Sequence, residues 1–181
     1  MTTDTSISSL INLEYIPYIS GNGQLPEQFQ GKIGVYAIFN QEKVLQFVGY
    51  SRDVYISLKQ HLVRQPQNCY WVKIATIERP NRTVLENLEK SWIAENGSVP
   101  LGNGDDKEKW TQPIDAKAIM TPEEKANYEN PIHDEITQIK IIKNVARRVE
   151  AEILAAIEAR GLQMQIRFNP KLKEEGLLDL K

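Results

Sequence analysis

The stretch IGVYAIFNQEKVLQFVGY, residues 33–50, consists of two runs rich in β-branched and aromatic residues, separated by the polar residues NQE. Runs of this composition are typical of β-strands, and a short polar connection between them is typical of a β-hairpin. We therefore expect residues 33–39 and 43–50 to pair as two antiparallel strands.

The segments after the hairpin predict a helix, a third strand and a second helix. Residues 51–65 carry apolar side chains at helical spacing, and the residues that support this helix are an N-cap, a first-turn acid and three apolar positions: Ser51, Asp53, Val54, Leu58 and Leu62. Residues 69–77 predict a strand, and residues 81–97 predict a helix that ends at Gly97. This order predicts an α/β fold, an α+β sandwich in which helices flank a small three-stranded antiparallel sheet.

The chain on either side of this region predicts two further parts. Residues 1–29 form an N-terminal extended segment with a polar start at 1–9 and a short strand within 10–19, and the sandwich domain covers residues 30–104. Residues 105–181 predict a loop and then a C-terminal helical extension.

Within the extension, Thr121–Glu124 has the capping-box pattern with Pro at the first helical position. A longer helix is expected from Asn130-Pro131 to about Arg160, and residues 162–168 predict a strand. The long helix has an apolar stripe, which forms either core or the seam of a homodimer: Ile132, Ile136, Ile139, Ile142, Val149, Ile153 and Ile157. It also has a basic cluster, which is either a solvated face or a DNA-backbone patch: Lys140, Lys143, Arg147 and Arg148.

The composition excludes several classes of protein. A net charge of −2 over 181 residues gives no overall attraction to nucleic acid, so any such binding needs a local patch. No segment has the apolar length of a membrane span or the pattern of a signal peptide, which predicts a cytoplasmic protein without membrane association. The single Cys69 cannot form an internal disulfide, and we expect it to be inert packing in a reducing compartment.

Two tripeptides, Gly34-Val35-Tyr36 and Phe47-Val48-Gly49, stand on the paired strands. They resemble the tripeptides of the GIY-YIG nuclease superfamily, and the helix 51–62, the helix 85–93 and the segment Pro100–Asn103 follow in that family's order. The resemblance covers Ile33 to Asn103. The sequences of the two tripeptides are most similar to those of a subgroup found in cyanobacterial proteins and in the N-terminal domain of plastid monothiol glutaredoxins.

The resemblance implies a phosphodiesterase that acts on nucleic acid, DNA above all, with one divalent ion, Mg²⁺ or Mn²⁺. By position, Tyr36 matches the residue that activates or positions water, and Glu89 matches the metal ligand. His61 lies one turn after the family's helix-1 Arg, and Asn103 matches the Asn after the second helix. A base, a cation and a metal each suit phosphodiester hydrolysis, because water is a weak nucleophile and the phosphate gathers charge as it reacts.

Two positions depart from the family pattern. Phe47 lacks the hydroxyl of the usual Tyr, and Ser57 stands where the family has the Arg that holds the scissile phosphate. Loss of that guanidinium removes a charge-assisted bidentate contact. Arg64 lies on nearly the same helix face about 10 Å further along, whereas Arg52 is rotated away, so each is a partial substitute.

Glu89 can be compared with its neighbour Glu86 without the resemblance. On a helical wheel Glu89 lies at the edge of the apolar side, while Glu86 points further towards solvent and completes a capping-box pattern with Thr83. A carboxylate against an apolar stripe is costly unless something pairs with it, which makes Glu89 the better ligand candidate.

Three functions remain open. The first is a metal-dependent endonuclease, weakened by Ser57. The second is a catalytically degenerate GIY-YIG module that binds nucleic acid or a protein partner. The third is a redox role for Cys69, which lacks a Cys-x-x-Cys partner. Against each stands plain packing, since a strand Tyr such as Tyr36 and an aromatic such as Phe47 are ordinary core residues.

Overall fold

The computed structural model describes residues 9–181, so nearly all of the polar start at 1–9 lies outside the described residues. The chain divides into two compact units, Met1–Thr111 and Gln112–Lys181. The first unit extends past the predicted limit at residue 104 and includes the N-terminal segment.

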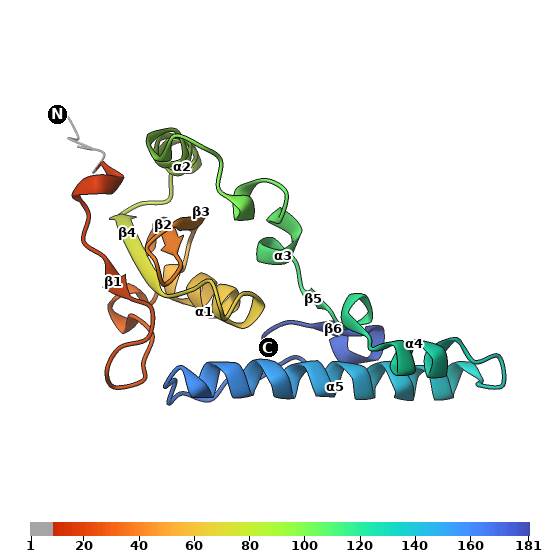
Figure 1. Ribbon diagram of the computed structural model, residues 1–181. Helices are drawn as coiled ribbons and strands as arrows, with labels where there is room; N and C mark the ends of the chain where they lie inside the picture. Colours follow the sequence, from red (N-terminus) through yellow and green to blue (C-terminus); the bar gives the residue numbers. More distant parts are fainter. Residues whose placement is uncertain (1–8) are drawn as a thin grey trace. The chain divides into compact units, whose positions relative to one another are not determined.

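The first unit is built on a four-stranded antiparallel sheet in the order β1-β4-β2-β3 (Figure 1). Its strands are β1 (Ile16–Pro17), β2 (Ile33–Phe39), β3 (Leu45–Ser51) and β4 (Trp71–Ile77). The predicted hairpin is confirmed, since β2 and β3 pair with Tyr36 opposite Gly49. The expected α+β fold is confirmed too, and the short strand expected within residues 10–19 forms as the two-residue edge strand β1, which joins the three predicted strands of the sheet.

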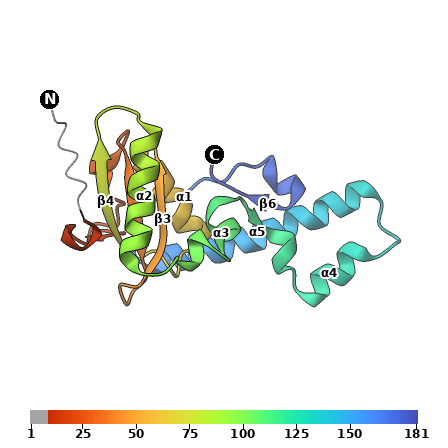
Figure 2. The same ribbon diagram turned by 90° about the horizontal axis from the view of Figure 1, so that it is seen from above.

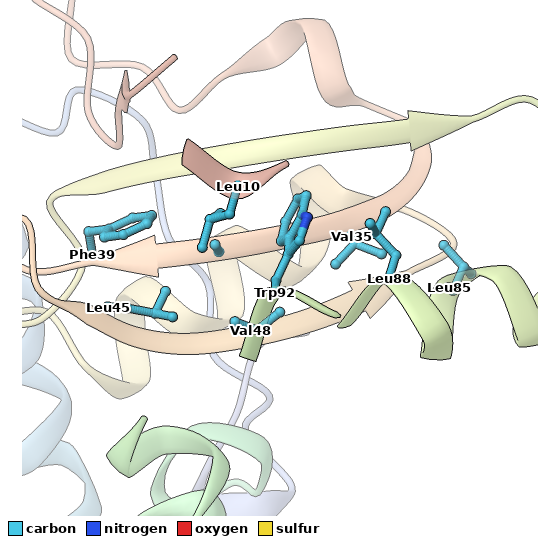
Figure 3. Packing of buried hydrophobic residues seen from close by; sticks show 9 residues of the cluster. Leu10, Val35, Phe39, Leu45, Val48, Leu85, Leu88 and Trp92 are labelled. Atoms are coloured by element: carbon cyan, nitrogen blue, oxygen red, sulfur yellow. The ribbon is translucent and has the colours of Figure 1, made fainter. Parts of the chain in front are cut away.

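Two helices flank this sheet, α1 (Val54–Arg64) and α2 (Arg82–Asn96). Helix α2 lies across one face (Figure 2). Figure 3 shows that its Leu85, Leu88 and fully buried Trp92 pack against strand residues and Leu10. Because side chains alternate along a strand, the residues between these positions, Tyr36 among them, face α1.

The caps of both helices differ from the predictions. Asp53, not Ser51, caps α1 by accepting from the backbone N–H of Ile56, because Ser51 is still the last residue of β3. Asn81, two residues before Thr83, caps α2, which starts at Arg82. The predicted capping box at Thr83 is therefore wrong, while the end at Gly97, in the left-handed region with φ 85°, is confirmed.

The segment after α2 is more ordered than the predicted loop. It contains a 3₁₀ turn, η3 (Leu101–Asn103), and a short helix, α3 (Lys107–Thr111). Trp110 of α3 is 2% exposed, so this segment is anchored in the core of the first unit. Two other 3₁₀ turns are η1 (Leu10–Asn12) and η2 (Glu27–Phe29).

The second unit centres on the long helix α5 (Glu135–Ala159). The other elements are β5 (Ile114–Asp115), η4 (Ala116–Ile119), α4 (Pro122–Glu129), η5 (Leu172–Glu175) and β6 (Leu177–Leu178). The capping box of α4 is confirmed. The expected start of α5 at Asn130-Pro131 is wrong, because Asp134 is the N-cap, and of the strand predicted at 162–168 only a single bridge at Phe168 forms.

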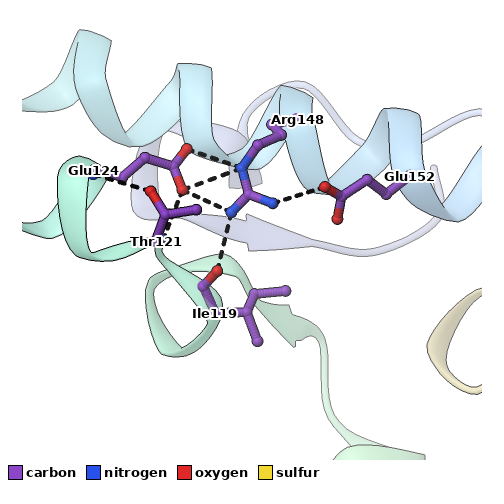
Figure 4. Close-up of polar contacts among 5 residues, drawn as sticks. All are labelled: Ile119, Thr121, Glu124, Arg148 and Glu152. Atoms are coloured by element: carbon purple, nitrogen blue, oxygen red, sulfur yellow. Dashed lines mark hydrogen bonds and ion pairs between the residues drawn. The ribbon is translucent and has the colours of Figure 1, made fainter.

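Two of the four residues of the basic cluster of α5, Lys143 and Arg148, are engaged in ion pairs within the second unit. Arg148 binds Glu124 of α4 through Nε and Nη2, with distances down to 2.7 Å, and also contacts Glu152 and the carbonyl of Ile119 (Figure 4). Lys143 pairs with Glu174 at 3.2 Å. These pairs join α4, η4 and η5 to α5, which favours a structural role for both cations.

The apolar stripe predicted for the long helix begins before α5, at Ile132, and divides into an exposed early part and a buried later part. Ile142, Val149 and Ile157 are buried, whereas Ile132 and Ile136, at 80% and 66% exposure, are open. The core role is thus confirmed for the later part only, and a homodimer seam at the earlier part stays a prediction. Within residues 9–181, no helix combines the length and apolar character that crossing a bilayer requires.

Candidate functional site

The first unit contains a cavity of about 580 Å³ beside β3. Residues from β2, β3, both large helices, η3 and α3 line it. The cavity brings together seven of the eight residues singled out from the sequence: Tyr36, Phe47, Ser57, His61, Arg64, Glu89 and Asn103. Arg52 is the exception, since it is exposed and lines a separate cavity of about 370 Å³ together with Arg82.

Tyr36 and His61 form the most buried polar pair of the site. The hydroxyl oxygen of Tyr36 lies 2.7 Å from Nε2 of His61, and each residue is 4% exposed. Burial raises the pKa of Tyr36, and burial followed by the charge of Arg64 lowers the pKa of His61 to about 3. At neutral pH the phenol is therefore protonated and the imidazole is neutral, so the phenol can donate to Nε2.

Helix α1 presents one polar face to the cavity, formed by Ser57, Gln60, His61 and Arg64. Because these positions are three or four residues apart, they lie on the same side of the helix. The Ser57 hydroxyl donates to Ser51 at 2.7 Å and carries no charge, so this face draws its positive charge from Arg64. Arg64 is itself held by a hydrogen bond from Nη1 to the carbonyl of Trp110 at 3.2 Å.

Glu89 contributes the carboxylate of the cavity. Burial raises the pKa of Glu89, and Lys107 opposes that rise. Within the part of the chain that the structure describes, this carboxylate has no hydrogen bond or ion pair. Glu86 lies outside the cavity lining and instead accepts from Arg82 at 2.7 Å and from Tyr50 at 3.2 Å.

The donor set fits a hydrated divalent ion rather than a closed metal site. Among residues 9–181 no three His, Cys, Asp or Glu side chains gather where they could hold a metal together. Mg²⁺ keeps several waters and commonly binds proteins through one or two carboxylates. The half-buried, unpaired carboxylate of Glu89 meets that requirement, and Mn²⁺ accepts the same ligands.

Asn103 acts on the backbone of β3. Its side-chain Nδ2 donates to the carbonyl of Val48 at 2.7 Å, and its Oδ1 accepts from the N–H of Val48 at 2.8 Å. Both ends of the amide are thereby used, which fixes η3 against the strand. Asn103 thus supports the cavity wall through the backbone of β3.

An aromatic wall closes the cavity behind the polar residues. Phe47 stacks on Trp110 with ring centroids 5.3 Å apart and an interplanar angle of 2°, and it contacts His61 at 4.7 Å. Gly49 makes room for this wall, because a Cβ there would lie 2.7 Å from both the Phe47 ring and the Tyr36 hydroxyl. The ring of Phe47 therefore packs against Trp110 and His61, and it offers the cavity no hydroxyl such as the family's Tyr would offer.

Sequence reasoning missed Lys107, which lines the cavity, and Trp110, which stacks on Phe47 behind the lining. Both belong to α3, in a segment that was predicted to be loop because it shows no periodicity. Cys69, by contrast, behaves as expected of a packed thiol, since it is fully buried and contacts the carbonyl of His61 at 3.5 Å. A reactive thiol needs exposure, so this burial disfavours the redox role.

No family model matches the chain. It is similar to "Bifunctional monothiol glutaredoxin-S16, chloroplastic" of Arabidopsis thaliana, with 34% identity over 103 residues. The match covers 55% of this chain and 33% of the plant protein, so the chain spans about a third of that relative's length. The expected resemblance to a plastid monothiol glutaredoxin is confirmed at this level.

Proposed function

We propose that the first unit is a GIY-YIG-type endonuclease domain that hydrolyses phosphodiester bonds of DNA with the help of one Mg²⁺ or Mn²⁺. The observation that carries the proposal is that the Tyr36–His61 pair, the unpaired Glu89 and Arg64 line one cavity. These residues come from three elements, and the order of those elements is that of the family which the two tripeptides resemble.

The reaction joins a water oxygen to phosphorus and breaks the bond from phosphorus to the leaving ester oxygen. A divalent ion held by Glu89 would supply Lewis-acid stabilisation of the phosphate charge. Arg64 adds a fixed positive charge on the opposite helix. The cavity therefore has a cation for the phosphate and a carboxylate for the metal.

Tyr36 positions the attacking water in this scheme. Because burial raises its pKa, Tyr36 is protonated at neutral pH and its hydroxyl oxygen accepts a hydrogen bond from the water. His61 lies behind it, 2.7 Å from the hydroxyl, with a neutral ring. As the water loses a proton to Tyr36, the phenol proton passes to Nε2 of His61, and the leaving oxygen takes up a proton from solvent.

The test is nicking of supercoiled plasmid by wild type in Mg²⁺, in Mn²⁺ and in EDTA. We expect metal-dependent nicking that Glu89→Ala and Tyr36→Phe each reduce by about two orders of magnitude or more. Glu86→Ala is the matched control, because Glu86 lies on the same helix, outside the cavity lining. Metal-dependent nicking that persists in Glu89→Ala would overturn the ligand assignment.

A second candidate function rests on Ser57. With no guanidinium at this position, the cavity has one arginine less than the family pattern, and a module that binds nucleic acid or a protein without cutting is the alternative. Such a module needs no metal, and its DNA affinity falls steeply with salt. Metal-independent, salt-sensitive DNA binding without nicking would favour it.

The place of action is part of the proposal. We propose that the chain works in the cytoplasm on DNA, whereas the similar plant protein is described as chloroplastic. The fully buried Cys69 is compatible with a reducing compartment. Fractionation of cells that produce the tagged full chain tests this assignment.

A further inference from the structure

The cavity must supply positive charge from positions other than Ser57. Among the described residues that line it, the Lys and Arg side chains are Arg64 of α1 and Lys107 of α3. Arg64 lies two helical turns after Ser57, so on its own it covers one end of the cavity. Lys107 lines the cavity from α3, whereas the Arg of the family pattern stands on the first helix.

Helix α3 is short but firmly anchored, which gives Lys107 a defined place. Trp110 is 2% exposed and stacks on Phe47, and its carbonyl accepts from Arg64. Gly102 leaves room for the indole, because a Cβ there would lie 2.9 Å from Nε1 of Trp110. Thr111, one turn after Lys107, donates to the carbonyl of Lys107 at 2.8 Å, and both residues line the cavity.

The surroundings of Lys107 set it apart from its neighbour Lys109. Lys109 pairs with Asp106 at 3.3 Å and lies outside the cavity lining. Lys107 has no ion pair with any residue in the described part of the chain, yet its charge acts on Glu89 across the cavity. A compact, rotatable ammonium group near a candidate metal ligand is well suited to bind a phosphate oxygen.

We infer that Lys107 is a phosphate-binding residue that, with Arg64, holds the phosphodiester of the substrate between Tyr36 and Glu89. The inference rests on the proposed function and extends it, because the charge expected at position 57 is divided between α1 and α3. The competing explanation is that Lys107 is only a counter-charge for Glu89. The two explanations differ once the charge of Glu89 is removed: a phosphate-binding Lys107 still contributes to DNA binding, whereas a mere counter-charge does not.

The experiment therefore uses Glu89→Gln as background and measures binding of a short fluorescein-labelled DNA duplex in EDTA over a salt series. We expect added Lys107→Met to weaken binding about tenfold and to lower the log–log salt slope by about 0.9, the value for one lost phosphate contact on duplex DNA. Lys107→Arg should keep both values. Lys109→Met is the matched control, with the same loss of charge two residues away, and should change both much less.

The outcomes separate the inference from the proposed function. If Glu89→Gln binds the duplex and Lys107→Met behaves like Lys109→Met, the inference is overturned while the proposed function stands. If neither the wild type nor Glu89→Gln binds or nicks DNA, both are overturned. In the otherwise wild-type chain with Mg²⁺, Lys107→Met should slow single-turnover nicking about tenfold, and Lys107→Arg should restore it.

Discussion

Tyr36 and His61 show how the environment of a residue decides its chemistry. A strand Tyr and a helix His are individually ordinary, but here their polar atoms lie 2.7 Å apart and both side chains are 4% exposed. Burial keeps the phenol protonated and the imidazole neutral. Neither group acts as a free base, so we expect the two to act as a pair. In the proposed reaction Tyr36 binds the water and His61 receives the proton.

The lowered pKa of His61 predicts a stability that depends on pH. With a folded pKa of about 3 and an unfolded pKa of about 6.5, the unfolded state binds the extra proton between these values. The contribution of His61 to the free energy of unfolding is therefore fully present above pH 6.5. It falls as the pH is lowered, by about 2 kcal/mol at pH 5.

Urea unfolding at pH 7 and pH 5 measures this effect. All three tryptophans, Trp71, Trp92 and Trp110, belong to the first unit, so their fluorescence reports on its unfolding. Between pH 7 and pH 5, the free energy of unfolding should fall by about 2 kcal/mol more in wild type than in His61→Gln. An equal loss in both proteins would contradict the assigned neutral state of His61.

At the scale of elements, the cavity depends on how closely β2, β3 and η3 approach one another. Gly49 of β3 leaves space for the rings of Phe47 and Tyr36, and the Asn103 amide ties η3 to Val48. Both contacts act on the backbone of β3. A small change at either position should therefore alter the cavity before it unfolds the unit.

Gly49→Ala should destabilise the first unit by about 2 kcal/mol and reduce nicking further than that loss explains. The new methyl group would lie 2.7 Å from both the Tyr36 hydroxyl and the Phe47 ring, so these rings must shift, and we expect the shift to disturb the contact of Tyr36 with His61. Gly21→Ala is the control, since a Cβ there meets nothing within 4 Å. Urea unfolding and plasmid nicking, measured side by side, separate the two effects, and equal behaviour of both variants would refute the packing argument.

Asn103→Asp should lower the free energy of unfolding of the first unit by about 2 kcal/mol. The new carboxylate can still accept from the Val48 N–H, but it has no donor for the Val48 carbonyl. Asn96→Asp makes the same chemical change where the amide donates to the carbonyl of Ser98 at an exposed site, and should cost much less. Thermal unfolding of the two variants gives the comparison. A similar midpoint for both would mean that the two bonds to Val48 do not stabilise η3.

Local sequence patterns predicted the elements that are stabilised locally. The hairpin, β4 and the helices α1 and α2 follow from composition and spacing, although the N-caps of both helices lie elsewhere than predicted. The helical wheel placed Glu89 rather than Glu86 near the apolar edge. Helix α3 could not be found this way, because five residues show no period and Trp110 is held by Phe47, which is distant in sequence. The resemblance pointed to Ser57 and the helical wheel to Arg64, whereas Lys107 could be identified only from the folded structure.

At the scale of the whole molecule, the first unit ends at Thr111, after the anchor Trp110. A fragment of residues 1–111 should fold with one cooperative urea transition. A fragment of residues 1–104 follows the boundary that the sequence predicted, and it lacks the indole that stacks on Phe47. We expect it to be less stable by about 3 kcal/mol, as followed by circular dichroism. Equal stability would show that α3 is peripheral to the unit.

The Asn103 amide has a consequence for how copies of this chain behave when crowded together. β3 is an edge strand of the sheet, and exposed N–H and C=O groups on such a strand are a template for pairing with another molecule. By binding both groups of Val48, Asn103 occupies the place that the backbone of an incoming strand would take. The side chain that shapes the cavity wall therefore also discourages intermolecular sheet growth, and its loss should promote aggregation in concentrated solution.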